Sequence, residues 1–276
     1  MKKNRFIISG GGTGGHIYPA ISIANKINES FNNPEIKFVG AIGRMEMNIV
    51  PKHGYNIQGL WISGLQRSFS IKNIVLPFKL IISLIQSIFI IIKYKPNFVI
   101  GTGGFASFPI VFISSILRIP TLIQEQNSFP GISNRLLSNY ANYISVAYDK
   151  MEKYFPSNKL FLTGNPVRES ISNSSSLIDL KKKLKIEECR IVISILGGSL
   201  GSDKINRTIE ENIDFIISQN IFIIWQCGKN YFEDYKKYNS TERILVFSVI
   251  HLFNLHKPVF HYKIQFLKRL IQSVYL

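Results

Sequence analysis

Three short glycine clusters, each at the end of a β-branched apolar run, constrain the fold of this chain more than any other feature. They are SGGGTGGH at Ser9–His16, GTGGFASFP at Gly101–Pro109 and GGSLGS at Gly197–Ser202. Each precedes a stretch with helical character. Glycine at such a joint allows a tight turn and brings a ligand close to the unpaired amides of the helix start, where the helix dipole favours an anion. These strand-to-helix turns predict an architecture of two α/β units that binds a diphosphate-bearing substrate.

Strand-like and helix-like segments alternate along the chain. Apolar residues recur at helical spacing over His16–Ser30, and Pro109–Leu117 reads as a helix or a buried run. This alternation predicts parallel sheets covered on both faces, with ligands beyond the carboxyl ends of the strands. The expected strands are Arg5–Ser9, Ile36–Val39, Asn97–Ile100, Thr121–Ile123, Tyr143–Val146, Leu160–Leu162, Arg190–Leu196 and Ile221–Gln226.

The length of 276 residues is sufficient for two domains, although one large domain is also compatible with it. Gly164-Asn165-Pro166 is a natural break, because glycine and proline end regular structure. A polar stretch follows this break, and then the pattern of strand, glycine turn and helix begins again. We therefore expect two α/β units that part near residue 165.

The balance of charge is strongly basic. The chain carries 33 Lys+Arg against 17 Asp+Glu, a formal net charge of +16. Such a charge favours anionic partners, namely nucleic acid, acidic lipid or a phosphorylated substrate. A solvated, lysine-rich surface accounts for the same excess. No nucleic-acid partner is expected, because no recognition motif combines aromatic and basic residues.

Cysteine usage and the N-terminus bear on cofactors and location. Cys189 and Cys227 form no CxxC or Cys/His spacing, so neither a metal nor another cofactor is expected. The apolar run Phe6–Ile8 is too short for the core of a signal peptide. We therefore expect the chain to stay in the cytoplasm.

The apolar segment Ile74–Ile92 raises the question of a membrane span. Pro77, Lys79 and several polar residues interrupt it, and the uninterrupted part is shorter than the roughly 20 residues that a span requires. A helix in the membrane interface and an ordinary core helix are the two interpretations. Flanking lysines favour contact with anionic lipid; they are Lys72, Lys79, Lys93 and Lys95.

The first glycine cluster fits neither of the common nucleotide-binding motifs. Gly10, Gly12 and Gly15 satisfy G-x-G-x-x-G, but Val39-Gly40-Ala41 stands where a dinucleotide site needs an acidic residue. No cluster continues with GK[ST], which excludes a P-loop. His16, directly after the glycines, is either a helix-start histidine bonded to the backbone or a general base, since imidazole titrates near neutral pH.

A series of short motifs occurs in order over about the first 230 residues. The ordered series is specific, although each glycine cluster alone is not. The motifs are Gly11-Gly12-Thr13-Gly14-Gly15-His16, Arg44-Met45-Glu46, Val50-Pro51-Lys52-His53-Gly54, Ile62-Ser63-Gly64-Leu65, Gly103-Gly104-Phe105, Glu125-Gln126-Asn127, Gly164-Asn165-Pro166-Val167-Arg168 and Gly197-Gly198-Ser199. In these motifs the chain resembles the MurG family, bacterial transferases of glycosyltransferase family 28 that build the lipid-linked precursor of peptidoglycan.

The resemblance implies a GT-B fold, two Rossmann-like domains with parallel sheets facing a cleft. It implies UDP-N-acetylglucosamine as the donor and the undecaprenyl-linked muramyl-pentapeptide, lipid I, as the acceptor. The sugar is transferred with inversion to give lipid II, and amides of the glycine turns, rather than a metal, offset the charge on the leaving diphosphate. The helix over Leu76–Ile92 is then a peripheral contact with the membrane surface, on the cytoplasmic side of the inner membrane.

The resemblance also assigns candidate site residues by motif. His16 becomes the candidate base, and Glu125 is a second candidate, either as base or as orienter. A carboxylate that satisfies loop amides is the alternative for Glu125. Gln124 stands where many relatives have histidine, so we do not expect that position to be catalytic. The candidates for binding the donor are Thr13, Gly14, Gly15, Asn127, Arg168 and Ser199, with Ile250 as a further contact to uracil.

The end of the chain departs from the family pattern. No glycine or acidic residue follows Glu242, and His251–Leu276 contains no recognisable βα unit. We therefore expect an N-terminal acceptor and membrane domain at 1–165, and an incomplete UDP-sugar domain at 166–276 that is divergent over 244–276. Because the second domain is incomplete, we expect this chain alone to have weak or no transferase activity. The alternatives are another GT-B transferase that acts on a glycolipid, or an inactive, membrane-bound scaffold.

Overall fold

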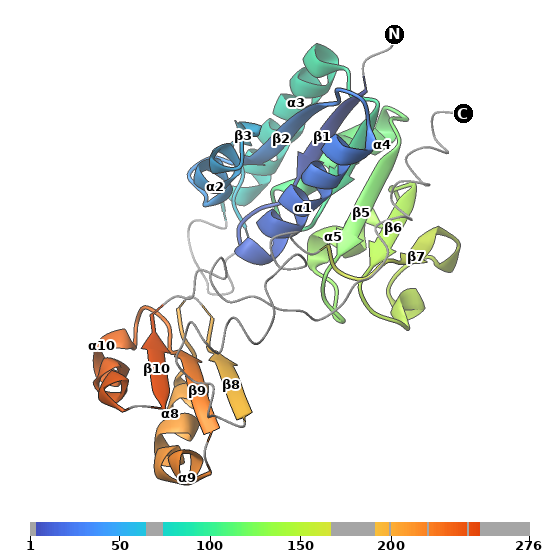
Figure 1. Cartoon of the computed structure of the whole chain (residues 1–276). Coiled ribbons are helices and arrows are strands. Elements are labelled where there is room, and N and C mark those ends of the chain that lie inside the picture. Colours follow the sequence, from blue (N-terminus) through green and yellow to red (C-terminus); the bar gives the residue numbers. More distant parts are fainter. Residues whose placement is uncertain are drawn as a thin grey trace. The chain divides into compact units, whose positions relative to one another are not determined.

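A computed structural model of the chain describes residues 4–64, 74–166, 191–198, 200–219, 221–241 and 243–248. The described residues belong to two compact units, one within 4–166 and the other within 191–248. Both units are α/β, with helices packed on parallel strands (Figure 1).

The first unit is built on a seven-stranded sheet with the strand order β3-β2-β1-β4-β5-β6-β7. All neighbouring strands run parallel. This order places β1, β4 and β5 side by side in the centre. The strands are β1 (Arg5–Ser9), β2 (Glu35–Ala41), β3 (Asn56–Leu60), β4 (Phe98–Gly101), β5 (Thr121–Glu125), β6 (Tyr143–Val146) and β7 (Leu160–Leu162).

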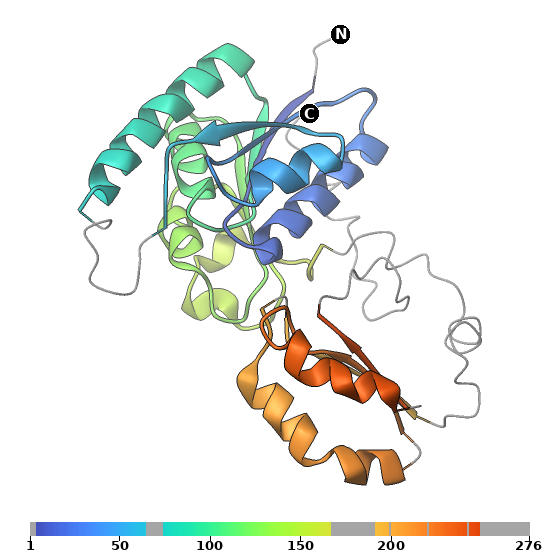
Figure 2. The same ribbon diagram turned by 90° about the vertical axis from the view of Figure 1, so that its left-hand side faces the viewer.

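Helices cover both faces of this sheet (Figures 1 and 2). Side chains alternate between faces along a strand, so Phe6 and Ile8 of β1 pack on one side and Ile7 packs on the other. Because both sides are buried, the central strands read as continuous apolar runs. Helices α1 (Gly14–Ser30) and α2 (Glu46–Lys52) contribute to one core, and α3 (Leu76–Tyr94), α4 (Ser107–Ile116) and α5 (Ile132–Leu137) contribute to the other.

Helix α3 buries few of its residues and exposes most of its large apolar side chains. Its buried residues are Ser83, Ser87, Ile90 and Ile91. The two serines donate to the carbonyls of Leu80 and Ser83, which satisfies their hydroxyls within the helix. Among the described helices, α3 is the one that is long enough and apolar enough to cross a membrane, judged by its length and composition alone. Its exposed apolar residues are Phe78, Ile81, Ile82, Ile85, Ile88, Phe89 and Ile92.

The second unit contains a parallel sheet with the order β10-β9-β8, formed by β8 (Ile191–Leu196), β9 (Ile221–Gln226) and β10 (Ile244–Phe247). Helices α8 (Asp203–Glu211), α9 (Ile213–Ser218) and α10 (Phe232–Tyr235) accompany it, followed by the 3-10 turn η4 (Lys236–Ser240) (Figure 2). Its core surrounds the fully buried Trp225. Strand β8 exposes Ile191, Ile193 and Leu196, and its one partner among the described residues is β9.

The sequence predicted eight of the ten strands that the structure describes. Four of them begin and end as expected: Arg5–Ser9, Tyr143–Val146, Leu160–Leu162 and Ile221–Gln226. The helices and strands that it missed are short: α2, β3, α5, α9, α10 and β10. Strand β3 alternates between exposed and partly buried residues at the edge of the sheet, so it lacks the apolar run of the central strands. Of the segment 244–276, which was expected to be divergent, residues 244–247 form β10, and 249–276 lie outside the described residues.

Candidate functional site

The loops that carry the motifs meet at one edge of the first sheet. Strands β1, β4 and β5 are parallel neighbours, so their carboxyl ends lie together. The loop after β1 holds the first glycine cluster, the loop after β4 holds the second, and β5 delivers Glu125-Gln126-Asn127. This edge is where open α/β sheets bind their ligands. The topology therefore joins three motifs that are far apart in the sequence.

The two glycine turns of this unit pack directly against each other. The Gly11 amide donates to the Gly103 carbonyl at 3.4 Å. Gly104 has a φ of +79°, and a Cβ there would lie 2.2 Å from the Gly11 carbonyl oxygen. The close approach of two backbones thus requires glycine at this position, in addition to any role in binding a ligand.

A buried carboxylate holds the first glycine turn. Glu46 accepts hydrogen bonds from the Gly12 amide and the Ala41 amide, each at 3.0 Å. The side chain is fully buried, and a Cβ on Gly11 would lie 2.1 Å from its Oε1. The Gly12 donor is therefore satisfied within the chain. The sequence analysis included Glu46 in a motif but assigned it no role. Its position between two apolar residues was the signal that could have indicated a buried carboxylate.

The start of α1 offers amides to a ligand. Thr13 is the N-cap residue, and its carbonyl accepts from the amides of both His16 and Ile17. Gly14 and Gly15 precede these first bonded amides, so their N–H groups stand at the positive end of the helix. Thr13 and Gly15 are exposed. These three predicted donor-binding residues therefore lie together and fit an anion.

His16 lies half-buried between the loops that follow β4 and β5. Its Nδ1 is 2.9 Å from the Thr102 carbonyl oxygen and 3.2 Å from Oε1 of Gln126. The hydroxyl of Thr102 in turn donates to the His16 carbonyl at 2.8 Å. A helix-start histidine bonded to the backbone was one of the two interpretations, and this contact is present. It engages one ring nitrogen, so it is compatible with a base that acts through the other.

Glu125 is buried and fully engaged by its own loop. Its Oε1 accepts from the amide and the side-chain Nδ2 of Asn127, both at 3.0 Å. Its Oε2 accepts from the Gly131 amide at 3.1 Å and from Nδ2 of Asn134 at 2.9 Å. This geometry matches the alternative in which the carboxylate satisfies loop donors. Asn127 itself is exposed at the carboxyl edge of the sheet.

The remaining predicted contacts, Arg168, Ser199 and Ile250, lie outside the described residues. The glycine turn that contains Ser199, in the second unit, is described in part. Gly198 and Gly201 have φ values of +81° and +92°, and the Gly197 amide donates to the Gln226 carbonyl at 2.9 Å. The third glycine cluster therefore forms a tight turn between β8 and α8. Among the described residues, no group of three or more His, Cys, Asp or Glu side chains is placed to hold a metal.

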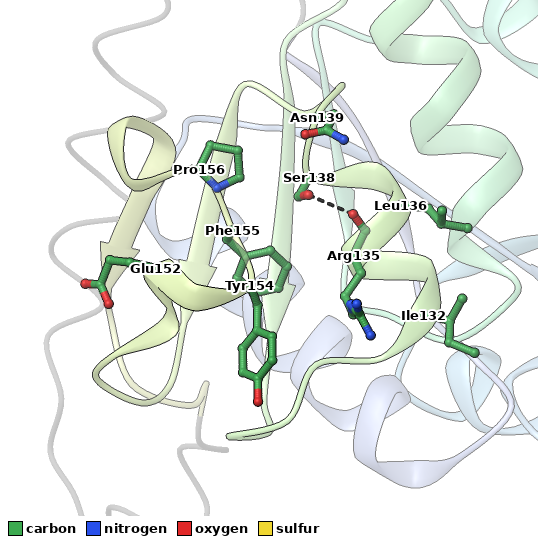
Figure 3. A pocket seen from close by; sticks show the side chains of 9 residues that line it. All are labelled: Ile132, Arg135, Leu136, Ser138, Asn139, Glu152, Tyr154, Phe155 and Pro156. Atoms are coloured by element: carbon green, nitrogen blue, oxygen red, sulfur yellow. Dashed lines mark hydrogen bonds between the residues drawn. The ribbon is translucent and has the colours of Figure 1, made fainter.

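A separate groove of about 540 Å³ lies in the first unit between α5 and the segment 152–156, which begins in the 3-10 turn η2 (Met151–Lys153). Figure 3 shows Arg135 and Tyr154 on its opposite walls, and the Ser138 hydroxyl donating to the Arg135 carbonyl at 2.7 Å. None of the predicted site residues lines this groove.

Comparison with family models and named relatives identifies related sequences. The glycosyltransferase family 28 N-terminal domain matches residues 6–146, and the family 28 C-terminal domain matches residues 192–257. A UDP-N-acetylglucosamine--N-acetylmuramyl-(pentapeptide) pyrophosphoryl-undecaprenol N-acetylglucosamine transferase of Flavobacterium psychrophilum is 52% identical, over 91% of this chain and 68% of the relative. The transferase of the same name from Christiangramia forsetii is 51% identical, over 86% of this chain and 65% of the relative. The chain thus spans about two thirds of the length of these relatives.

Solved structures share the fold. A crystal structure of Acinetobacter baumannii MurG superposes with a TM-score of 0.63 at 22% identity, covering 91% of this chain and 67% of that one. A UDP-GlcNAc 2-epimerase of Neisseria meningitidis, bound to UDP-GlcNAc, gives a TM-score of 0.61 at 15% identity, over 92% of this chain and 73% of that one. The expected GT-B class with two parallel-sheet units is confirmed. Since both family models match and a named relative is 52% identical, this chain belongs to glycosyltransferase family 28.

Proposed function

We propose that this chain transfers N-acetylglucosamine from UDP-N-acetylglucosamine to lipid I, the undecaprenyl-linked muramyl-pentapeptide, and so forms lipid II for peptidoglycan. The observation that carries the proposal is the 52% identity, over 91% of the chain, to a relative named for this transfer. The meeting of the motif loops around His16 supports it, because a sugar transferase needs a proton acceptor beside a site for a diphosphate.

The donor binds through backbone amides and through polar side chains. Thr13, Gly14 and Gly15 present the start of α1 to the diphosphate, where the helix dipole lowers the energy of the charge that develops on the leaving group. Asn127 offers amide donors and an acceptor to sugar hydroxyls. By the motif resemblance, Arg168, Ser199 and Ile250 are further contacts to the donor.

The chemistry requires one proton transfer and one displacement. The 4-hydroxyl oxygen of the acceptor attacks the anomeric carbon of the donor sugar, and the bond from that carbon to the β-phosphate oxygen breaks. UDP leaves with the bonding electrons, and the configuration at the carbon inverts. His16 takes the hydroxyl proton. Glu125 holds the loop that carries Asn127 through four hydrogen bonds and acts as orienter.

The chain acts at the cytoplasmic surface of the inner membrane as a peripheral protein. Helix α3 supports this, because Phe78 and Phe89 are 66% and 68% exposed on a helix with few polar residues. The cation of Lys79 lies 5.6 Å from the centre of the Trp61 ring, and Lys93 and Lys95 are exposed at the other end of the helix. An apolar face with cations at both ends suits the interface of an anionic bilayer.

The work is divided between the two halves of the chain. Residues 1–165 form the acceptor and membrane domain, which also supplies the donor contacts at the start of α1 and at Asn127, and residues 166–276 form the partial UDP-sugar domain. The first part contains α3 and the His16 loops, and the second contains the third glycine turn.

Transfer is tested with the full chain, radiolabelled UDP-N-acetylglucosamine and two acceptors, a short-chain lipid I analogue and diacylglycerol. We expect label in the lipid I product alone. His16→Ala reduces the rate by about 100-fold or more, because a general base contributes about 10²–10⁴. Label in diacylglycerol would instead indicate another glycolipid transferase.

Binding without transfer separates a remnant from an enzyme. Titration calorimetry with UDP-N-acetylglucosamine measures the donor site by itself. Binding of lipid vesicles with no donor binding and no transfer would contradict the proposal and favour a membrane-bound scaffold.

A further inference from the structure

We infer that Gln126 is a positioning residue for His16. It holds the imidazole in the tautomer that carries its proton on Nδ1, so that Nε2 is the atom that accepts the hydroxyl proton of the acceptor. The role of His16 as base rests on the proposed function, whereas the tautomer is a property of the free chain.

The surroundings of Nδ1 identify it as a donor. The Thr102 carbonyl oxygen lies 2.9 Å from Nδ1, and Oε1 of Gln126 lies 3.2 Å from it. A carbonyl oxygen can only accept a hydrogen bond, and a neutral imidazole has one N–H and one acceptor nitrogen. A lone pair on Nδ1 would face two oxygen atoms. The proton therefore belongs on Nδ1.

The orientation of the Gln126 amide is itself determined by its neighbours. Its Nε2 donates to the Thr102 carbonyl at 2.7 Å and also to Oε1 of Gln124. A flipped amide would set its oxygen against these two acceptors and lose both bonds. Oε1 of Gln126 is therefore turned towards His16.

Gln124 extends this chain of amides away from the histidine. It is buried, and its Nε2 lies 3.5 Å from Oδ1 of Asn165. Asn165 donates through Nδ2 to the Gln126 carbonyl at 3.3 Å. The amides of Asn165 and Gln124 thus lie in line behind Gln126, and the Thr102 carbonyl, as a pure acceptor, fixes the direction of the Gln126 amide. Such a network holds the ring in advance of the reaction.

The backbone closes the same edge of the ring. A Cβ on Gly103 would lie 2.8 Å from Nδ1 of His16 and 2.9 Å from its Cε1. The Nδ1 edge is thus packed against protein, and Nε2, on the far side of the ring, remains for the acceptor. When Nε2 takes the proton, the imidazolium keeps the Nδ1–H bonds to Thr102 and Gln126, which stabilise the new charge.

The test is nitrogen NMR of the full chain labelled with ¹⁵N-histidine at pH 8, where long-range proton couplings distinguish the two tautomers. The signals of His16 are those that disappear in His16→Gln. We expect the Nδ1–H tautomer in the natural chain. We expect Gln126→Met, which keeps the length but removes both polar groups, to raise the share of the Nε2–H tautomer.

Kinetics with the same variants separate positioning from folding. Gln126→Met lowers kcat by about 10- to 100-fold, because the base loses its alignment, while KM for the UDP-sugar changes by less than about twofold. Gln126→Glu keeps an acceptor towards Nδ1 and so restores the Nδ1–H tautomer, but it lacks the donor to the Thr102 carbonyl and restores only part of kcat. Gln58→Met, on the exposed face of β3, is the matched control and leaves both measurements unchanged.

A natural chain with His16 protonated on Nε2, or a Gln126→Met variant with an unchanged tautomer, overturns the inference whether or not sugar is transferred. An Nδ1–H tautomer in a chain that transfers no sugar leaves the inference standing and removes the proposed function instead.

Discussion

At the scale of residues, buried carboxylates in this protein organise loops. Glu46 holds the turn after β1, and Glu125 holds the loop after β5. Both are almost completely buried. All of their described hydrogen bonds come from backbone amides and asparagine side chains. A buried carboxylate is stable only when its lone pairs are satisfied, so each one ties several donors into a fixed geometry.

The two roles considered for Glu125 differ in what Glu125→Gln changes. As an orienter, the new NH₂ group faces donors at Asn127 or at Gly131, and the free energy of unfolding falls by about 1–3 kcal/mol. Affinity for the UDP-sugar falls with it, because Asn127 loses its support. Denaturant unfolding and calorimetry measure both quantities, with the exposed Glu152→Gln as control. A fall in kcat with unchanged stability and affinity would favour a base instead.

Tyr94 makes the free energy of unfolding depend on pH in the alkaline range. Burial raises the pKa of the Tyr94 hydroxyl to about 12, and the Glu35 carboxylate adds to this. Its hydroxyl is buried without a hydrogen-bond partner among the described residues. The folded state binds the proton more tightly than the unfolded state, so this contribution is complete below about pH 10 and is lost as the pH rises towards 12.

Tyr94→Phe removes this dependence. We expect the free energy of unfolding at pH 8 to stay the same or rise by up to about 1 kcal/mol, because an unsatisfied hydroxyl is removed. Between pH 10 and 12 the variant should lose less stability than the natural chain. Urea unfolding across this range measures the difference, and Tyr148→Phe, half exposed, serves as control. An equal decline in both chains would contradict the assignment.

At the scale of elements, the joints between strands and helices combine two demands on glycine. Gly104 has positive φ and touches the Gly11 backbone, whereas Gly43 has a φ of +73° with nothing within 4 Å of a built Cβ. The pair separates the cost of conformation from the cost of close approach.

Gly104→Ala should lower the free energy of unfolding by more than Gly43→Ala does. A left-handed conformation alone costs about 1–2 kcal/mol for a non-glycine residue, and the contact with the Gly11 carbonyl adds a backbone shift at Gly104. Thermal unfolding of the two variants gives the comparison. Similar losses in both would show that the two glycine turns can separate freely.

Helix α3 carries an apolar face that remains exposed in the first unit. Replacing Phe78 and Phe89 together by serine should lower binding to anionic vesicles by about tenfold or more, since a buried phenylalanine contributes about 1.5–3 kcal/mol. Sedimentation with vesicles measures the bound fraction. Phe215→Ser, equally exposed on α9, is the control. Equal binding by the double variant and the control would place the membrane contact elsewhere.

At the scale of the whole molecule, each unit has its own core. The two tryptophans divide between them, with Trp61 in the first unit and the fully buried Trp225 in the second. Buried Asn206 donates to the Cys227 carbonyl at 2.9 Å and accepts from the Trp225 indole N–H at 3.0 Å. This side chain therefore joins α8 to β9 in the second unit.

Asn206→Leu should destabilise the second unit alone. Two buried polar groups lose their partner, at about 1–3 kcal/mol each. In a Trp61→Phe background, the fluorescence of Trp225 reports the unfolding of the second unit, and circular dichroism reports both units. We expect the fluorescence midpoint to fall while the first unit's transition stays in place. A common shift of both transitions would mean that the units unfold as one.

The fold was largely predictable from the sequence, because its central strands are buried on both faces and therefore have continuous apolar sequences. Short peripheral elements were not: α2 has only seven residues, contains Pro51 and buries a charged residue, Glu46, and β3 alternates polar and apolar residues at the sheet edge. Within the site, the motifs predicted Thr13, Gly14, Gly15, His16 and Asn127 as a set. The role of Gln126 was not predictable, since it depends on the direction of one amide relative to a carbonyl 24 positions away.

The sequence by itself determined the class of fold, because periodicity and glycine turns are local properties of the chain. It also determined the family, because the ordered motifs can be recognised without coordinates. Only the tertiary structure decided which atoms meet. The parallel order of β1, β4 and β5 brings three distant loops to one edge, and the packing there gives Nδ1 of His16 two oxygen partners. Hydrogen-bond direction arises from contacts between residues far apart in the chain, and no local pattern encodes it.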